Sequence, residues 1–262
     1  MAAEACLQQG MVIGIYPSQW NLAEITELIH TAFLVHRGIV NLKEWTNSDG
    51  PLKDMQFGNK MAVLSGDFLL ANACTGLAQL NNTKVVELLS SAIGDLVQGI
   101  YYENSIQGEE NNMTDNIKIA SWEEQAFLSH GALLAKSCQA AMELAKHDAK
   151  AQALAFQYGK HMSLGHKLNS DLQPFLKGSS SDTVSFSLNS APVILHQETI
   201  GREGWTHQID QLWRAIKAGK GVSTAIDLCC YHGNKALEAL KCFPPSEARS
   251  ALESIAFAVT KF

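Results

Sequence analysis

Apolar residues recur at helical spacing along almost the whole chain, and this constrains the fold more than any other feature. From Leu22 onward, Ile25, Leu28, Ile29 and Ala32 follow at short steps, so that they share one face of a helix. The chain has only 6 prolines, and no pair of alternating segments joined by a tight turn indicates a hairpin. The sequence therefore predicts an all-α protein.

Seven helices and two shorter apolar segments are expected, and the stretches between them are polar. The expected helices span residues 22–40, 57–80, 83–105, 122–147, 150–175, 222–243 and 245–262, and the apolar segments span 186–200 and 205–217. Loops are expected at 47–51, 107–121 and 177–182. No internal repeat is visible, so residues 1–262 are expected to form a single domain.

Composition and charge exclude several classes of protein. The net charge is -6, whereas a duplex-binding protein usually carries a basic face, so nucleic acid is not expected as a partner. No uninterrupted apolar run reaches the length of a bilayer, so no transmembrane segment is expected. The first residues contain Glu4 and lack arginine, unlike a secretory signal or a transit peptide. The six cysteines form no C-x-x-C pair and are expected as buried thiols in a reducing compartment.

Several segments, in order, resemble the trans-isoprenyl diphosphate synthases, the all-α enzymes that elongate polyprenyl chains. They are ITELIHTAFLVH at 25–36, GNKMAVLSGDFLLANA at 58–73, LLAKSCQAAMEL at 133–144, AFQ at 155–157 and the helix at 243–261. The resemblance implies a helical bundle around a central cavity. It also implies that N-terminal helices of the family, with a basic segment that grips isopentenyl diphosphate, are missing from this chain.

The two aspartate-rich motifs of that family have lost every carboxylate in this chain. The degenerate motif positions are Arg37, Gly38, Asn41, Lys160, His161 and Leu164. In the family these motifs hold the Mg²⁺ ions that bridge the diphosphate leaving group. Mg²⁺ prefers carboxylate oxygens, and the cations at two of these positions repel it. The sequence therefore predicts no catalytic residue and no metal ligand here.

Within the family, the pattern is similar to the catalytically poor subunits of two-subunit synthases. The resemblance implies a regulatory, non-catalytic subunit of a decaprenyl diphosphate synthase that supplies the ubiquinone side chain in mitochondria. It implies a heterotetramer with the catalytic subunit 1, which would hold the Mg²⁺ and bring isoprenoid diphosphates to the complex. This chain should be inactive alone, and its remaining diphosphate contacts would be Lys60, Lys136 and Gln157.

The resemblance also implies where the partner binds. In the family, the helices matching 57–80 and 83–105 form the subunit interface. Small residues allow two helices to approach closely, and the first of these helices is rich in them. They are Ser65, Gly66, Ala71, Ala73, Gly76 and Ala78. Without the missing helices, the apolar faces of the helices that start at Leu22 and Trp122 should be exposed beside an open apolar groove.

Two other functions stay open at this point. One is an isoprenoid-diphosphate-binding helical protein, in which Arg37, Lys160 and His161 replace Mg²⁺ electrostatically. The other is a self-sufficient prenyltransferase with atypical metal ligands, drawn from the unpaired carboxylates Asp49, Asp54, Asp67 and Asp171.

Single histidines and Asp67 are expected to have structural roles. His30 and His36 are expected as core histidines, and Asp67 as a buried hydrogen-bonding group. His161 and His166 are five residues apart and miss the usual zinc spacing.

Overall fold

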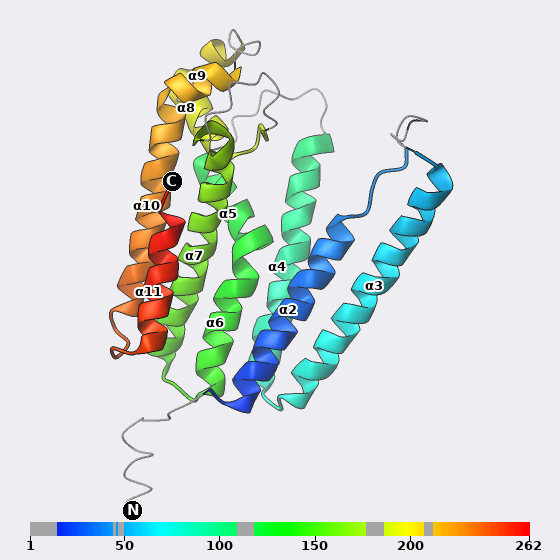
Figure 1. Cartoon of the computed structure of the whole chain (residues 1–262), viewed down its shortest axis with the longest axis vertical. Coiled ribbons are helices and arrows are strands. Elements are labelled where there is room, and N and C mark those ends of the chain that lie inside the picture. Colours follow the sequence, from blue (N-terminus) through cyan, green and yellow to red (C-terminus); the bar gives the residue numbers. More distant parts are fainter. Residues whose placement is uncertain (1–14, 44–45, 47–49, 109–117, 177–185, 207–211) are drawn as a thin grey trace, which may run out of the picture. The chain divides into compact units, whose positions relative to one another are not determined.

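The structure is a computed structural model that describes residues 15–43, 46, 50–108, 118–176, 186–206 and 212–262. Every regular element among these residues is a helix (Figure 1), so the predicted all-α class is confirmed. They pack as two compact units, Met1–Leu88 with Ala140–His147, and Leu89–Gln139 with Asp148–Phe262. The single domain over residues 1–262 and its central cavity stay predictions.

The first unit is built on α2 (Pro17–Arg37) and α3 (Leu52–Gln79), which run side by side (Figure 1). The buried residues of α2 are Leu22, Ile25, Ile29 and Ala32, which confirms the apolar face predicted from their spacing. A Cβ at Gly76 of α3 would lie 2.9 Å from Ile25 Cγ1. The absence of a side chain at Gly76 therefore lets α3 approach α2 closely.

The bounds of α2 differ from the expected range of 22–40. The helix begins at Pro17 because proline suits the first helical turn, and the Tyr16 N–H donates to Gln19 Oε1 at 3.0 Å. It ends at Arg37, and the N–H of Gly38 caps the carbonyls of Leu34 and Val35. The first motif positions beyond Arg37 are therefore not helical.

The second unit contains most of the chain's helices. They are α4 (Thr83–Gly108) from Leu89 on, α5 (Ile119–Ala126), the π-helical turn η2 (Phe127–Gly131), α6 (Ala132–Leu144) up to Gln139, α7 (Ala149–Leu176), α8 (Ala191–Thr206), α9 (Leu212–Ala218), α10 (Lys220–Leu240) and α11 (Glu247–Val259). The run α5–η2–α6 replaces the single helix expected at 122–147.

The later helices match the expected ranges within a few residues, with two local differences. Helix α11 begins after Ser246, whose Oγ accepts the Arg249 N–H at 3.1 Å, rather than at Pro245. Helix α8 starts later than 186, and Gly201 kinks it with a φ of 69°. The loop expected at 177–182 and most of that at 107–121 lie outside the described residues.

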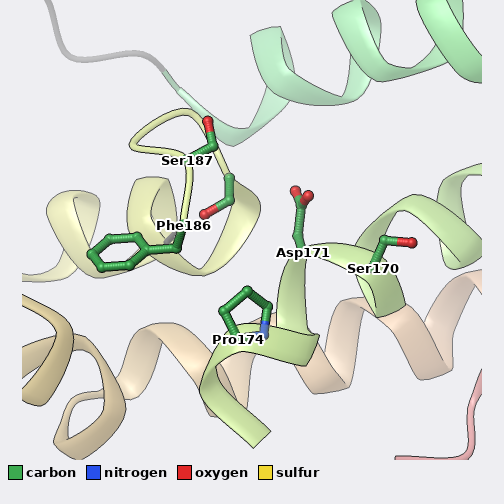
Figure 2. Close-up of a pocket in the computed structure, with 6 residues that line it drawn as sticks. Ser170, Asp171, Pro174, Phe186 and Ser187 are labelled. Atoms are coloured by element: carbon green, nitrogen blue, oxygen red, sulfur yellow. The ribbon is translucent and has the colours of Figure 1, made fainter. Parts of the chain in front are cut away.

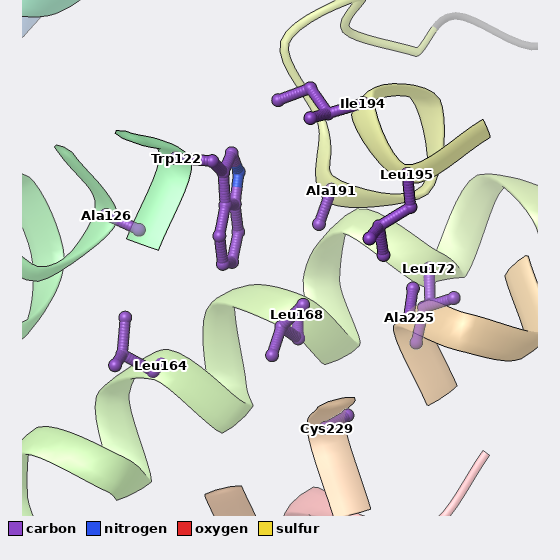
Figure 3. Packing of buried hydrophobic residues seen from close by; sticks show 10 residues of the cluster. All are labelled: Trp122, Ala126, Leu164, Leu168, Leu172, Ala191, Ile194, Leu195, Ala225 and Cys229. Atoms are coloured by element: carbon purple, nitrogen blue, oxygen red, sulfur yellow. The ribbon is translucent and has the colours of Figure 1, made fainter. Parts of the chain in front are cut away.

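Helix α7 forms the centre of the second unit. Leu164, Leu168 and Leu172 recur every four residues and pack in one cluster with Trp122 of α5 and Cys229 of α10 (Figure 3). Each large apolar side chain buried in this way contributes roughly 1.5–3 kcal/mol. The cluster therefore fixes α5 and α10 on α7.

The apolar faces that were expected to be exposed are covered. Leu22 is 2% exposed and Trp122 is 3% exposed, so that expectation is wrong. Trp122 packs into the α7 cluster, and the face of α2 that carries Leu22 includes the contact with Gly76. In the first unit, large exposed apolar side chains lie on α3. The open apolar groove stays a prediction.

The cysteines are only partly as expected. Cys229 is buried, Cys138 and Cys230 are half-buried, and Cys74 and Cys242 are exposed. The expectation of buried thiols is confirmed for Cys229 and wrong for the two exposed cysteines. Burial raises the pKa of Cys138 to about 11 and that of Cys229 to about 12, so both thiols are protonated at neutral pH. Cys6 lies outside the described residues.

Gly159 supplies a test of the packing of α7 on α6. A Cβ at Gly159 would lie 2.7 Å from Ala135 Cα and 2.9 Å from Leu134 O, which are backbone atoms that cannot rotate away. We expect Gly159→Ala to lower the free energy of unfolding by about 1–3 kcal/mol, measured by urea denaturation.

The matched control is Gly94→Ala on α4. Gly94 is exposed and helical, and a Cβ there would meet nothing within 4 Å. Alanine should raise stability at this position by up to about 1 kcal/mol through its helix propensity. Equal effects of the two substitutions would contradict the close approach of α6 and α7.

Candidate functional site

The first motif segment follows α2, and contacts with an aromatic ring and an amide hold it. The Arg37 guanidinium lies over the Phe33 ring, with its carbon 5.5 Å from the ring centroid. Beyond the helix, Asn59 of α3 holds Val40 in place. Its Oδ1 accepts the Val40 N–H at 3.0 Å, and its Nδ2 donates to the Val40 carbonyl at 2.9 Å. Asn41 Oδ1 accepts a backbone N–H at 3.1 Å. The Asn59 amide of α3 therefore anchors the segment that follows α2.

The Gly66–Asp67 pair on α3 interacts with the end of α2. His36 Nε2 lies 3.4 Å from Asp67 Oδ1 and 3.3 Å from the Val63 carbonyl. A Cβ at Gly66 would overlap the His36 ring, so glycine makes room for the imidazole. The Asp67 side chain is 64% exposed, which makes the expectation of a buried group wrong.

The two α2 histidines are not core residues. His36 is half-buried, and His30 is exposed because it lies off the apolar face of the helix. The expectation of core histidines is therefore wrong for His30, and only partly met by His36.

The second motif segment lies on α7 in the other unit, and its three positions have three different environments. Lys160 Nζ lies over the Phe127 ring, 5.4 Å from its centroid. His161 Nδ1 lies 2.8 Å from His232 Nδ1. Leu164 belongs to the core cluster. The segment therefore presents a cation, an imidazole pair and an apolar side chain where the family presents carboxylates.

Both imidazoles of this segment have strongly lowered pKa values. Burial lowers the pKa of His161 to about 4, with further lowering by His232, Lys160 and Lys235. Burial and then Lys160 lower the pKa of His232 to about 4. Both rings are therefore neutral at pH 7. They add no positive charge that could hold a diphosphate.

The residues expected to contact diphosphate lie on α6, α7 and α3, and their role stays a prediction. Lys136 Nζ is 2.5 Å from Asp95 Oδ2 and 3.0 Å from Ser91 Oγ, so its ammonium already has a counter-ion from α4. Gln157 is exposed on α7. Lys60 is exposed on α3 and belongs to the first unit. A ligand at Lys136 would have to compete with the Asp95 carboxylate.

A hollow of about 320 Å³ lies between α7 and the turn that enters α8 (Figure 2). Asp171 lines it, but both carboxylate oxygens are engaged. Oδ1 lies 2.6 Å from Lys167 Nζ, and Oδ2 accepts the Ala191 N–H at 3.0 Å. Asp171 therefore caps the start of α8. A carboxylate in the wall also disfavours a diphosphate in this hollow.

Two candidate carboxylates remain. Asp54 lies in the first turn of α3, and Asp49 lies outside the described residues. Within the described ranges, no three His, Cys, Asp or Glu side chains are close enough to hold a metal ion.

Sequence reasoning missed the partners of the residues it singled out. His232 pairs with His161, Asp95 pairs with Lys136, and Glu123 lies 3.3 Å from His232. These contacts join helices distant in sequence. No local spacing motif could therefore have indicated them.

Comparisons with known proteins place this geometry in context. The sequence profile described as Polyprenyl synthetase matches residues 2–181. The chain is 68% identical over 269 residues to the All trans-polyprenyl-diphosphate synthase PDSS2 of Mus musculus, which covers 98% of this chain and 67% of that protein. The chain therefore spans about two thirds of the length of this relative.

Two further relatives are more distant. Mitochondrial Solanesyl-diphosphate synthase 1 of Oryza sativa is 30% identical and covers 90% of this chain and 57% of its own length. Decaprenyl-diphosphate synthase subunit 1 of Schizosaccharomyces pombe is 29% identical, over 92% of this chain and 68% of its own length.

A solved structure confirms the expected bundle. The apo form of an Arabidopsis medium/long-chain length prenyl pyrophosphate synthase matches with a TM-score of 0.73 and 28% identity, over 93% of this chain and 81% of that chain.

Proposed function

Because the chain belongs to the polyprenyl synthetase family, we propose that it acts as the non-catalytic, regulatory subunit of a heteromeric trans-polyprenyl diphosphate synthase. The complex makes the decaprenyl side chain of ubiquinone in mitochondria. The rice relative is named as mitochondrial and the fission yeast relative as a subunit, which supports the location and the heteromeric assembly.

The observation that carries the proposal is the use of the six motif positions. Each lacks a carboxylate, and the side chains of Lys160 and His161 are engaged with Phe127 and His232. The side chains at these positions cannot hold Mg²⁺ bound to diphosphate, because an ammonium or guanidinium repels the ion and cannot ligate it. The Mg²⁺ and the chemical step therefore belong to the catalytic partner.

Neither alternative function has an observation in its favour. A self-sufficient prenyltransferase would need paired free carboxylates, but Asp171 caps α8 and Asp67 contacts His36. A protein that binds isoprenoid diphosphate would use Arg37, Lys160 and His161, but the two cations lie over aromatic rings and the His161 imidazole is neutral at pH 7.

An exposed apolar seam on α3 supports the partner. Phe57, Met61, Leu64, Phe68 and Ala71 follow one another at alternating steps of four and three residues, and all are exposed. Phe57 is 65% exposed and Phe68 is 68% exposed. This spacing is that of a helix that packs against another helix along one stripe. We assign the seam to the catalytic subunit.

The side chains of the seam become smaller along α3. Its first half carries the bulky side chains, and beyond Phe68 it continues with Ala71, Thr75 and Ala78. A partner helix that has the same order of bulky and small side chains and runs in the opposite direction would place its small side chains against the bulky side chains of α3. An antiparallel helix from a partner of the same family therefore fits the seam.

The small residues of α3 divide between two faces, which corrects the expectation that all six serve the partner. Gly66 faces His36, and Gly76 faces Ile25 of α2 in the same chain. Ala73 is fully buried. Ala71 is exposed on the seam. Close approach at Gly66 and Gly76 therefore serves α2, whereas Ser65, Ala71 and Ala78 are exposed and available to a partner.

Helix α3 is also long and apolar enough to cross a membrane, and 17% of its most apolar stretch is buried. A helix from the core of a soluble protein can have the same length and composition. The expectation that the chain has no transmembrane segment stays a prediction.

We expect the purified chain to show no Mg²⁺-dependent prenyl transfer, because neither motif supplies a ligand for the ion. The measurement is incorporation of labelled isopentenyl diphosphate into an allylic primer. The control mixes the chain with its catalytic subunit, which should give polyprenyl product. Metal-dependent turnover by the chain without its partner would contradict the non-catalytic assignment.

We expect Ala71→Glu to weaken binding of the catalytic subunit by at least about tenfold, because an unpaired charge is desolvated in the interface. Binding is measured by titration of the two purified subunits. The matched control is Gln56→Glu, which adds the same charge to an exposed residue of α3 off the seam.

The two variants together decide the interface. Ala71→Glu should leave the helical content and thermal unfolding of the chain unchanged, because Ala71 has no buried contact of its own to lose. If Ala71→Glu binds as tightly as Gln56→Glu, the seam is not the interface.

A further inference from the structure

Three side chains from three helices form a line in the second unit. His161 of α7 contacts His232 of α10 through their Nδ1 atoms at 2.8 Å, and His232 Nε2 lies 3.3 Å from Glu123 Oε1 of α5. The His232 side chain is 3% exposed. Helices α5 and α10 both pack on α7 (Figure 1). The line therefore joins the three helices through the buried His232, with a half-buried residue at each end.

The carboxylate fixes which atoms carry protons. An ionised Glu123 can only accept, so His232 must donate to it through Nε2. A neutral His232 then has a bare Nδ1, which can only accept. His161 must therefore donate through its own Nδ1, and its Nε2 is bare. Both histidines are thus held in one defined tautomer each.

We propose that His161, His232 and Glu123 form a proton-sensitive latch that joins α7, α10 and α5 when both imidazoles are neutral and opens when both are protonated. The latch occupies a position where catalytic members of the family place a carboxylate. It needs no metal, and it does not depend on the proposed function of the chain.

Charges from every neighbouring element bear on the latch. They are Lys160 on α7, Lys235 and Glu238 on α10, and Glu123 on α5, with the Tyr231 ring edge-on to His161. The two ammonium groups oppose protonation, and burial adds to their effect. The Glu123 carboxylate favours protonation of His161, but less strongly than burial and the ammonium groups oppose it. The folded chain therefore keeps both rings neutral well below pH 6.5.

Protonation acts on the latch in two steps. A first proton can be shared, because a charged His232 can donate to His161 if His161 changes its tautomer. A second proton leaves two donors and two positive charges facing each other at 2.8 Å. The unfolded chain takes up these protons near pH 6.5, and the folded chain near pH 4. Stability is thus present above pH 6.5 and is lost as pH falls towards 4.

The tautomers are tested directly on the 262-residue chain with ¹⁵N-labelled histidine. Two-bond ¹H–¹⁵N correlation spectra at pH 7.5 report which ring nitrogen carries the proton, and His161→Gln and His232→Gln spectra assign the signals. We expect the proton on Nδ1 in His161 and on Nε2 in His232. A proton on Nε2 of His161, or on Nδ1 of His232, overturns the latch.

The pH dependence is the second test. For each imidazole kept neutral in the folded chain, the unfolding equilibrium constant should rise by up to about tenfold for every unit that the pH falls between pH 6 and pH 4.5. In His161→Gln, the pH dependence of the unfolding equilibrium constant should be weaker by at least one of these tenfold factors. His166→Gln is the matched control, because His166 is exposed on the same helix, and it should keep the wild-type slope.

Equal slopes for His161→Gln and His166→Gln overturn the proposal. If His161→Gln does not fold, the tautomers of the unaltered chain decide alone.

Discussion

A magnesium ion that bridges a protein and a diphosphate needs anionic oxygen ligands, and the rest of the account depends on this requirement. The chain keeps the fold of its catalytic relatives but has Arg37 and Lys160 at motif positions. Both side chains lie over aromatic rings of their own unit. Each cation thus contacts an aromatic ring of its own unit at a position where the resemblance implies a metal ligand.

Helix α7 shows how a segment that supports chemistry in the family serves structure here. Gly159 allows close approach to α6, and Leu164 lies in the cluster with α5 and α10. Between them, His161 bonds to His232 of α10. The segment is thus used for packing between helices of the second unit, and the α3 seam of the first unit is exposed.

The helices and the loss of the motifs could be predicted from sequence because both are local properties. The period that places Leu22, Ile25 and Ile29 on one face follows from helix geometry alone. Contacts between helices could not be predicted in this way. Spacing did not show that Gly66 and Gly76 face α2 and that Ala71 lies on the exposed seam. It also gave no sign of the His161–His232 contact, which spans 71 residues.

Calorimetric titration of the isolated chain with an allylic diphosphate analogue, with and without Mg²⁺, tests the central claim most directly. A catalytic family member needs the ion to hold the diphosphate, and serves as the positive control. The account predicts that Mg²⁺ does not strengthen binding of the analogue to this chain, because cations and an imidazole pair replace the ligands. Tight binding of the analogue that appears only with Mg²⁺ would contradict it.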